Sequence, residues 1–316
     1  MSLAVTPPVW LNRLDCAKIT FVLRFVDSVE IPAIALLQLR REFIGALKEL
    51  EQRQDDEVVQ LVKSLLFQEP LDDPVIHRLV QKPSAAVILS PDCSMEDRFV
   101  SGNRIALPAL FVGDGIVCIN AFLVLLQTLG ERGLFHGRGR FVVDTLIQND
   151  GSSEEQRFDA APGAVTPTIV PFAWMLNQKL WQKNKVKLEV VTPIRLIKKG
   201  KPMFKLTVKD FFTALVRRIS SQAALHTGEE VDMDHCQLVD LAVGLECREY
   251  DLHWHDWRHL EGRHRTQGIG GLTGSMTLAG DSLKEIFWLL ELGSLLHVGK
   301  GASYGYGRFR LVDVVD

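Results

Sequence analysis

The chain has 316 residues, of which 47% are hydrophobic and 24% are charged, and its formal net charge is −3. This balance is typical of a folded protein with room for two domains, and it excludes a disordered or fibrous chain. The five cysteines are scattered without a Cys-x-x-Cys pair, which argues against a disulfide framework or a zinc ribbon.

The first half of the chain predicts the order strand, helix, strand, strand, helix, strand. Apolar and polar residues alternate over 18–25, as in a half-buried strand. Pro32 then stands where the first turn of a helix tolerates proline, and apolar residues recur every three or four positions over 36–50. A further helix over 57–67 is expected before strands over 85–89 and 105–112. A helix over 119–129 and a strand over 140–145 complete this half.

The second half repeats the same plan. We expect a strand over 187–197, a helix over 208–224 and strands over 241–247 and 272–278. A helix capped by Asp281 or Ser282 then runs to Leu296, and a strand over 308–314 ends the chain. Few large apolar residues and several turn formers occupy 148–168, which predicts a linker.

A short sequence repeat supports this duplication of the element order. Each half carries Leu-Gly within its last helix and Gly-x-Gly-Arg-Phe before its last strand, at 129–141 and at 292–309. The sequence therefore predicts an α+β protein of tandem duplicated ferredoxin-like (βαββαβ) domains. Their expected limits are 1–147 and 169–316, joined by the linker 148–168.

Positive charge is concentrated in one segment. Nine lysines and three arginines lie between Lys179 and Arg218 against two acidic residues, a net charge of +10. A basic segment inside a near-neutral total indicates a face that meets phosphate, although a solvated lysine-rich surface has the same composition.

The glycine-rich run 297–309 is the most informative motif. It holds four glycines in nine residues, between a helix and a strand. Backbone N–H groups in such a loop favour an anion, Lys300 and Arg308 supply charge, and Tyr304 and Tyr306 are able to stack on bases. A tight turn that simply needs glycine is the alternative. A Walker loop is excluded, because there the strand precedes the loop.

This run resembles the signature loop of the CRISPR repeat-processing endoribonucleases of the RAMP superfamily, in the form His-Val-Gly-Lys-Gly-x-x-x-Gly-x-Gly-Arg. The segments 192–200, 211–221, 256–258 and 270–275 are also similar to that family, as is 130–141 in the first half. The resemblance implies two ferredoxin-like domains and a metal-independent cleavage of precursor transcripts. The substrate's 2′-hydroxyl attacks the adjacent phosphorus, leaving a 2′,3′-cyclic phosphate.

The chain departs from the family in its first helix, where many members place a catalytic His or Tyr. Residues 27–54 contain neither. Histidine suits proton transfer and arginine suits charge stabilisation. The candidate catalytic residues are therefore His297, His136, Arg40 and Arg41.

The candidate RNA-binding residues are basic or aromatic side chains in the matching segments. They are Arg138, Arg140, Arg195, Lys198, Lys199, Lys201, Arg217, Arg218, Trp257, Arg258, Lys300, Tyr304, Tyr306 and Arg308.

A histidine cluster leaves alternatives open. His253, His255 and His264 could bind zinc as histidines, but no cysteine or carboxylate lies at a compelling ligand spacing from them. Base stacking and phosphate contact by Trp257, Arg258 and His259 is favoured, and an ordinary surface strand is the other alternative. No metal and no cofactor are expected.

We therefore expect an endoribonuclease that binds CRISPR repeat RNA in precursor crRNA, as a monomer or homodimer, with other CRISPR effector subunits as further possible partners. The alternatives are a non-catalytic RAMP subunit that holds guide RNA in an effector complex, and a small-molecule enzyme on the same scaffold. Residues 1–14 lack a signal peptide and the apolar stretches are too short to span a bilayer. The expected location is cytoplasmic, away from membranes.

Overall fold

The computed structural model describes residues 8–30, 32–53, 56–69, 83–94, 98–148, 155–176, 183–227, 233–257 and 269–314. Contacts divide the chain into two compact units. The N-terminal unit comprises 15–69 and 83–170, and the C-terminal unit comprises 171–316 together with 8–14, each as far as described. The expected domain limits remain a prediction, because contacts alone do not test independent folding.

An antiparallel sheet forms one layer of the N-terminal unit. Its strands β1 (Asp15–Phe25), β3 (Val87–Leu89), β5 (Arg104–Val112) and β6 (Phe141–Gln148) lie in the order β3-β5-β1-β6. Strand β7 (Gln156–Asp159) pairs with β6 and lies inside the segment that was expected to be a linker. A short hairpin joins β2 (Val29–Glu30) to β4 (Arg98–Phe99), and β8 (Val170–Pro171) pairs with β1.

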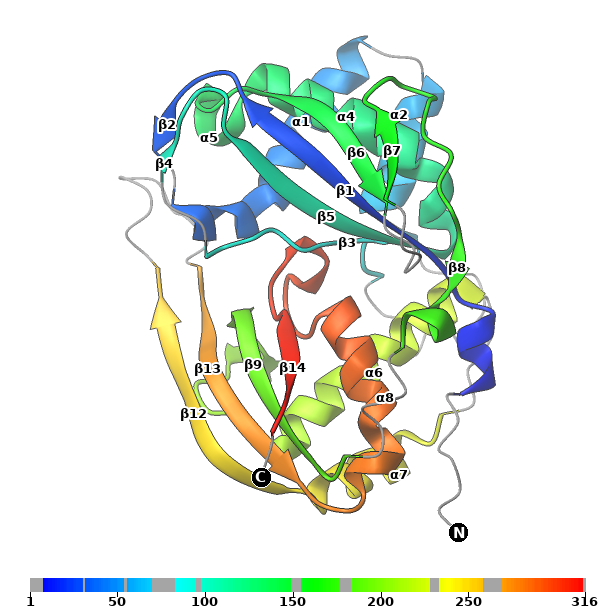
Figure 1. Cartoon of the computed structure of the whole chain (residues 1–316), viewed down its shortest axis with the longest axis vertical. Coiled ribbons are helices and arrows are strands. Elements are labelled where there is room, and N and C mark those ends of the chain that lie inside the picture. The colour runs from blue at the N-terminus through cyan, green and yellow to red at the C-terminus, as the bar shows by residue number, and fades with distance from the viewer. Residues whose placement is uncertain are drawn as a thin grey trace. The chain divides into compact units, whose positions relative to one another are not determined.

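Helices cover one face of this sheet (Figure 1). They are α1 (Leu39–Arg53), α2 (Asp56–Leu66) and α4 (Ile119–Arg132). The alternation in β1 buries Phe21 and Phe25 completely beneath them. Pro32 precedes a 3-10 helix, η2 (Ala33–Gln38), so α1 begins later than the apolar periodicity predicted. Residues 113–132, which are η3 (Gly113–Cys118) and α4, are apolar and long enough to cross a bilayer, but 67% of the window is buried, as in a core helix.

The C-terminal unit has the same strand order. Its sheet runs β12-β13-β9-β14, formed by β12 (Glu246–Asp256), β13 (Gly270–Ala279), β9 (Lys185–Ile194) and β14 (Phe309–Asp313). Helices α6 (Val208–Thr227) and α8 (Leu283–Leu296) pack against one face. In both units the first strand lies between the third and the fourth, with the second at the edge. The prediction of an α+β protein with tandem ferredoxin-like domains is confirmed.

Smaller elements complete the C-terminal unit. They are η1 (Val9–Asn12), η4 (Phe172–Met175), the hairpin of β10 (Ile197–Lys198) and β11 (Lys201–Pro202), α7 (His235–Val243) and η7 (Ala302–Tyr304). Trp10 of η1 packs edge to face on Trp288 of α8, with ring centroids 6.3 Å apart.

Two local predictions are wrong. The expected strand over 241–247 is instead the last three residues of helix α7, a turn, and the first two residues of β12, which begins only at Glu246. Ser282 precedes α8 but does not cap it, because its hydroxyl donates to the carbonyl of Leu241 at 2.9 Å instead.

The repeated motif lies at equivalent places. In each unit its phenylalanine, Phe141 or Phe309, is the first residue of the closing strand, which pairs with the first strand. The preceding helix carries Gly130 or Gly293 where it meets that strand. A Cβ on Gly130 would overlap the carbonyl oxygen of Phe141, and one on Gly293 would lie 3.0 Å from the ring of Phe309. The repeat therefore marks close packing of the last helix on the last strand.

Candidate nucleic-acid interface

The C-terminal glycine-rich loop, residues 297–308, is held by backbone hydrogen bonds within itself and to residues 193–195. The N–H groups of Val298, Lys300 and Gly307 donate to the carbonyls of Gly307, Arg195 and Pro193 at 2.8–3.1 Å. The amides of residues 302, 304, 305 and 306 also donate within the loop. These amides are therefore occupied by the protein, unlike the exposed N–H groups that the sequence led us to expect.

Two of its glycines are needed for close approach. Gly299 and Gly307 have φ of +94° and +69°, which side chains rarely adopt. A Cβ on Gly299 would lie 2.6 Å from the carbonyl oxygen of Arg195, and one on Gly307 would overlap the carbonyl of Val298. Tight packing thus accounts for these glycines.

His297 begins the loop and is buried, with 1% of its surface exposed. Its Nδ1 donates to the carbonyl of Ala302 at 3.2 Å, because a carbonyl oxygen only accepts. Desolvation lowers the pKa of His297 to about 3, and the positive charges of Arg308 and Arg218 add to that effect. The imidazole is therefore neutral at physiological pH. The C-terminus of a helix favours a cation, but burial outweighs that effect here.

Two side chains support the loop from the core. Thr192, which is fully buried, donates its hydroxyl to the carbonyl of Gly305 at 2.5 Å and accepts the N–H of Arg308 at 2.9 Å. Arg218 of α6 donates to the carbonyl of Leu296 and to the hydroxyl of Ser303, both at 3.2 Å. Burial lowers the pKa of Arg218 to about 10, so the guanidinium keeps its charge at neutral pH.

The exposed part of the loop is small. Lys300 is exposed, and Tyr306 and Arg308 are half-buried. Tyr304 is only 6% exposed, so its ring packs in the protein and does not present a face for stacking. Of the four side chains predicted to meet RNA here, Lys300 is the most accessible.

Within the basic segment, residues 197–202 form an exposed hairpin between β9 and α6. Lys198, Lys199 and Lys201 are all exposed, and Lys198 pairs with Asp210 at 2.9 Å. Lys199 and Gly200, with φ of +51° and +78°, form its tight two-residue turn. Arg195 precedes the hairpin and is half-buried, and Arg217 of α6 is exposed.

The histidine cluster is only partly described. His253 and His255 are exposed on β12, and His253 contacts Asp251 at 2.8 Å. Trp257 lies just after the strand, with its ring 5.7 Å from that of His255. Arg258, His259 and His264 lie outside the described residues. Within the described part, no group of three or more His, Cys, Asp or Glu is placed to hold a metal ion.

The N-terminal unit has a shorter loop at the equivalent place, after α5 (Leu134–Gly137). Helix α5, which leads into this loop, is held by Glu42 of α1. This carboxylate is only 3% exposed and accepts the N–H of Phe135 at 3.2 Å. Arg138 and Arg140 are exposed, and Arg140 binds Asp27 through two hydrogen bonds of 2.7 and 3.1 Å. These bonds hold the pKa of Asp27 below its usual value. The side chain of His136 lies outside the described residues.

Arg40 and Arg41, the other catalytic candidates, lie in the first turn of α1 and are both exposed. The Nε of Arg41 lies 3.5 Å from the carboxylate of Glu42. The helix therefore offers cationic side chains beside the carboxylate that holds the N-terminal loop.

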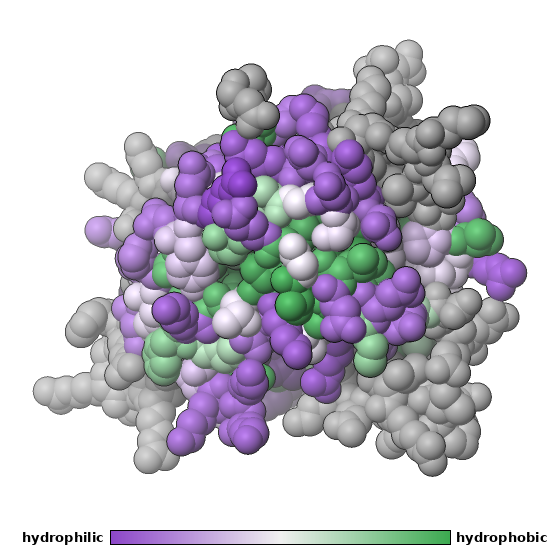
Figure 2. Space-filling view, turned by 90° about the horizontal axis from the view of Figure 1, so that it is seen from below, coloured by the Kyte–Doolittle hydropathy of each residue, from purple (hydrophilic) through white to green (hydrophobic). Residues whose placement is uncertain are grey.

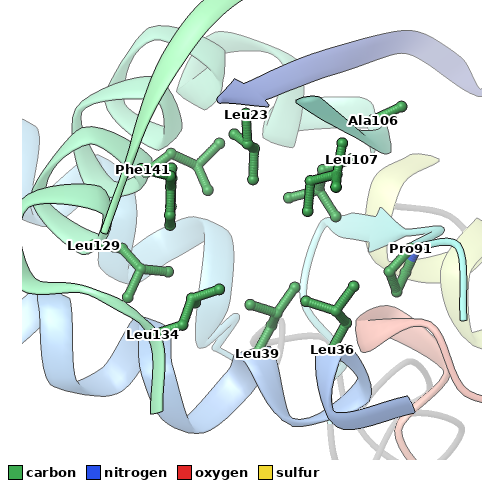
Figure 3. Close-up of a pocket in the computed structure, with 11 residues that line it drawn as sticks. Leu23, Leu36, Leu39, Pro91, Ala106, Leu107, Leu129, Leu134 and Phe141 are labelled. Carbon is green, nitrogen blue, oxygen red and sulfur yellow. The ribbon is translucent and has the colours of Figure 1, made fainter. Parts of the chain in front are cut away.

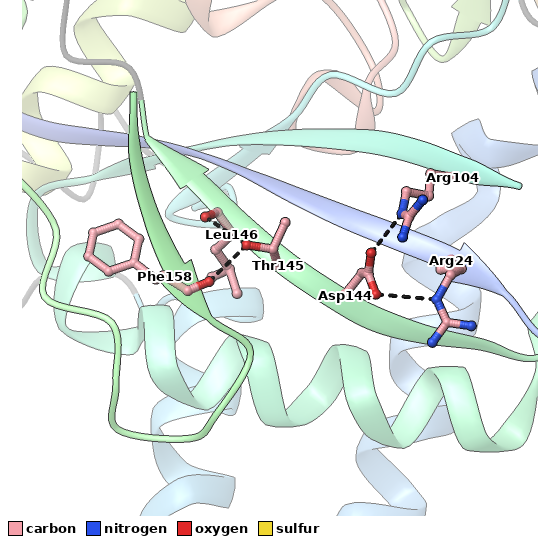
Figure 4. Close-up of polar contacts among 6 residues, drawn as sticks. All are labelled: Arg24, Arg104, Asp144, Thr145, Leu146 and Phe158. Carbon is pink, nitrogen blue, oxygen red and sulfur yellow. Dashed lines mark hydrogen bonds and ion pairs between the residues drawn. The ribbon is translucent and has the colours of Figure 1, made fainter. Parts of the chain in front are cut away.

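One basic cluster was missed by the sequence analysis. Arg24 of β1 and Arg104 of β5 share the carboxylate of Asp144 on β6, at 3.2 and 2.7 Å (Figure 4). Hydrogen bonds from Arg104 and Arg24 hold the pKa of Asp144 below its usual value. The alternation in β1 had placed Arg24 opposite the buried phenylalanines, but only the strand order shows that it meets Arg104.

The apolar cavity among the described residues of the N-terminal unit does not support a small-molecule site. A cavity in the N-terminal unit is lined only by apolar side chains, among them Leu36, Leu39, Leu134 and Phe141 (Figure 3). Such a lining has no group for acid, base or nucleophilic chemistry. The surface in Figure 2 shows an apolar area enclosed by hydrophilic side chains.

Comparison with known proteins agrees with the fold. The structure is similar to part of a chain in a Cas6-RT-Cas1–Cas2 complex, with a TM-score of 0.57 and 13% identity, covering 98% of this chain and 47% of that one. It is also similar to Thermus thermophilus Cas6, with a TM-score of 0.52 and 15% identity, covering 95% and 99%. A Cas6 product complex gives a TM-score of 0.53 and 17% identity, covering 94% and 99%. The chain thus spans about half the length of the first of these relatives. No curated protein matches.

The structure has two ferredoxin-like units, with a glycine-rich loop before the last strand of the second one. Residues 188–309 match the family model of the CRISPR-associated endoribonuclease Cas6. This match includes most of β9, all of β12 and β13, and the loop, and it ends at the first residue of β14. It confirms the resemblance to the CRISPR repeat-processing endoribonucleases. It supports an assignment to CRISPR RNA binding and processing.

Proposed function

We propose that the protein is a metal-independent endoribonuclease that cuts CRISPR precursor transcripts within the repeat. The observation that carries the proposal is the match over 188–309, which contains the loop fixed by His297, Thr192 and Arg218. That loop presents Lys300 at the surface, close in sequence to Arg308.

The chemistry forms a bond between the 2′-oxygen and phosphorus and breaks the bond from phosphorus to the 5′-oxygen. A base accepts the 2′-hydroxyl proton, an acid protonates the leaving oxygen, and cations stabilise the charge on the phosphate oxygens. Lys300, Arg40 and Arg41 suit the cationic role because they are charged and exposed. His136 remains a candidate for proton transfer.

His297 suits a positioning role better than a catalytic one. A neutral, buried imidazole that donates to Ala302 fixes the start of the loop. Its direct participation requires that the ring become accessible to the scissile phosphate.

Single-turnover cleavage of a labelled repeat RNA tests the proposal. Cleavage is expected to survive EDTA and to leave a cyclic phosphate. Loss of a general acid or base lowers the rate by about 10²–10⁴ while leaving affinity nearly intact. We therefore expect His136→Ala or Arg41→Ala to slow cleavage more than His297→Gln. Activity abolished by EDTA and restored by Mg²⁺ would overturn the proposed mechanism.

A non-catalytic subunit that holds guide RNA is the second candidate. It is favoured by the absence of His and Tyr over residues 27–54 and by the burial of His297. Tight binding of repeat RNA with no cleavage under single-turnover conditions would establish it. Assembly with other CRISPR subunits is a further proposal, suggested by the similarity to a fused complex.

A further inference from the structure

An exposed aromatic pair lies on the C-terminal unit, outside all residues assigned above. Phe204 is 63% exposed, although large apolar side chains usually avoid such exposure. Its ring packs edge to face on Trp254 of β12, with centroids 4.6 Å apart and planes at 62°. Much of the phenylalanine ring therefore lies in solvent while the indole supports it.

Hydrogen bonds anchor the chain on both sides of Phe204. On one side, the N–H of Met203 donates to the carbonyl of Leu196 at 3.0 Å. On the other, the N–H of Leu206 donates to the hydroxyl of Tyr250 on β12, also at 3.0 Å. Binding a ligand to a ring fixed in this way costs little conformational entropy.

Room for the indole is provided by a glycine on the neighbouring strand. A Cβ on Gly270 of β13 would lie 3.1 Å from the Trp254 ring, closer than almost all real contacts. The pair is therefore built by three elements: β12, β13 and the segment after β11.

Positive charge surrounds Phe204 in the sequence. Lys199 and Lys201 are exposed on the hairpin that leads to it, and Lys205 follows it directly and is also exposed. An aromatic face beside a track of cations is the combination that binds single-stranded nucleic acid without base-specific contacts, because every base has a π-face and every linkage a phosphate.

We propose that Phe204, supported by Trp254, is a stacking site for an unpaired base of single-stranded RNA, whose phosphates contact Lys199, Lys201 and Lys205. The inference rests on the proposed function for the identity of the natural RNA, but the stacking itself does not depend on cleavage. The charges favour RNA over a protein partner.

The test measures the affinity of the full chain for a short fluorescent oligoadenylate. Phe204→Ala is expected to raise the Kd by about 5- to 100-fold, the usual range for losing one stacked base. Phe204→Tyr is expected to restore affinity because it keeps the ring. Trp174→Ala is the matched control, since Trp174 is 76% exposed in the same unit and has no charged residue within four positions on either side in the sequence. Thermal unfolding of each variant checks that the fold is intact.

The outcomes separate this inference from the proposed function. Oligoadenylate binding that depends on Phe204, without cleavage of repeat RNA, supports the stacking site and refutes the nuclease. If repeat RNA is cleaved but Phe204→Ala binds oligoadenylate as tightly as the natural protein does, the stacking site is overturned and the nuclease is not. Failure of the natural protein to bind oligoadenylate also overturns it. Self-association that disappears in Phe204→Ala, with no change in RNA affinity, would assign the pair to a protein contact instead.

Discussion

The buried hydroxyl of Thr192 is a point at which one substitution should weaken the C-terminal loop, because it bonds to both Gly305 and Arg308. Thr192→Val keeps the shape of the side chain but removes the donor and the acceptor. Each buried polar group left unpaired costs about 1–3 kcal/mol. Gly305 is buried and Arg308 is half-buried, so water is able to reach the second group more easily. We expect Thr192→Val to lower the free energy of unfolding by about 2–4 kcal/mol.

Urea unfolding followed by tryptophan fluorescence measures this effect in the correct unit. The six tryptophans lie at position 10 and between 174 and 288, within the C-terminal unit, and the N-terminal unit has none. The emission therefore reports the unit that contains Thr192.

Thr213→Val provides the matched control. Thr213 is exposed on α6, and its hydroxyl donates only to the carbonyl of Lys209, one turn earlier in the same helix. We expect a change within about 0.5 kcal/mol there. If Thr192→Val were as mild as Thr213→Val, the loop would not depend on the threonine and the reasoning would be refuted.

Two further predictions concern charge. Replacing Lys198, Lys199 and Lys201 with glutamine should weaken RNA binding and reduce the slope of log affinity against log salt by about 0.7 for each lost phosphate contact. Lys63→Gln is its control, because Lys63 is paired with Glu51 in the N-terminal unit, and an equal slope in both variants would show that the hairpin lysines only face solvent. For His297, the folded pKa of about 3 lies below the ordinary value of 6.5, so the unfolded chain binds a proton that the folded chain does not. The free energy of unfolding should fall by about 1.4 kcal/mol for each pH unit below that ordinary value, until the pH approaches the folded pKa. Urea titrations should show a weaker pH dependence in His297→Gln, and an unchanged dependence would mean that the ring protonates in the folded state.

Periodicity and the internal repeat were sufficient to predict the fold. The alternation over 18–25 predicted β1, and the spacing over 119–129 predicted the core of α4. The end of helix α7 was read as strand because Leu241, Ala242 and Val243 form a short continuous apolar run, which fits a strand or a helix equally well. The hairpin at 197–202 was missed because its strands have two residues each.

The site was harder to predict because its residues meet through the tertiary structure. His297 and Tyr304 have chemical groups that suit catalysis and stacking, but both are buried, and burial depends on residues far away in the chain. Phe204 and Trp254 are 50 positions apart and become neighbours only because the segment after β11 crosses the edge strand. No local pattern reports such a contact.

The two copies of Gly-x-Gly-Arg-Phe show which packing positions the two halves still share. Both keep the glycine in the last helix and the phenylalanine that opens the last strand, where a bulkier helix residue would push the strand away. The residues between them have changed freely in length and charge. The internal repeat is therefore visible in the parts that close each sheet, and it includes Arg140 and Arg308, two of the candidate RNA-binding residues. A sequence search with this motif would find proteins of the same architecture, but it would not show whether they are active.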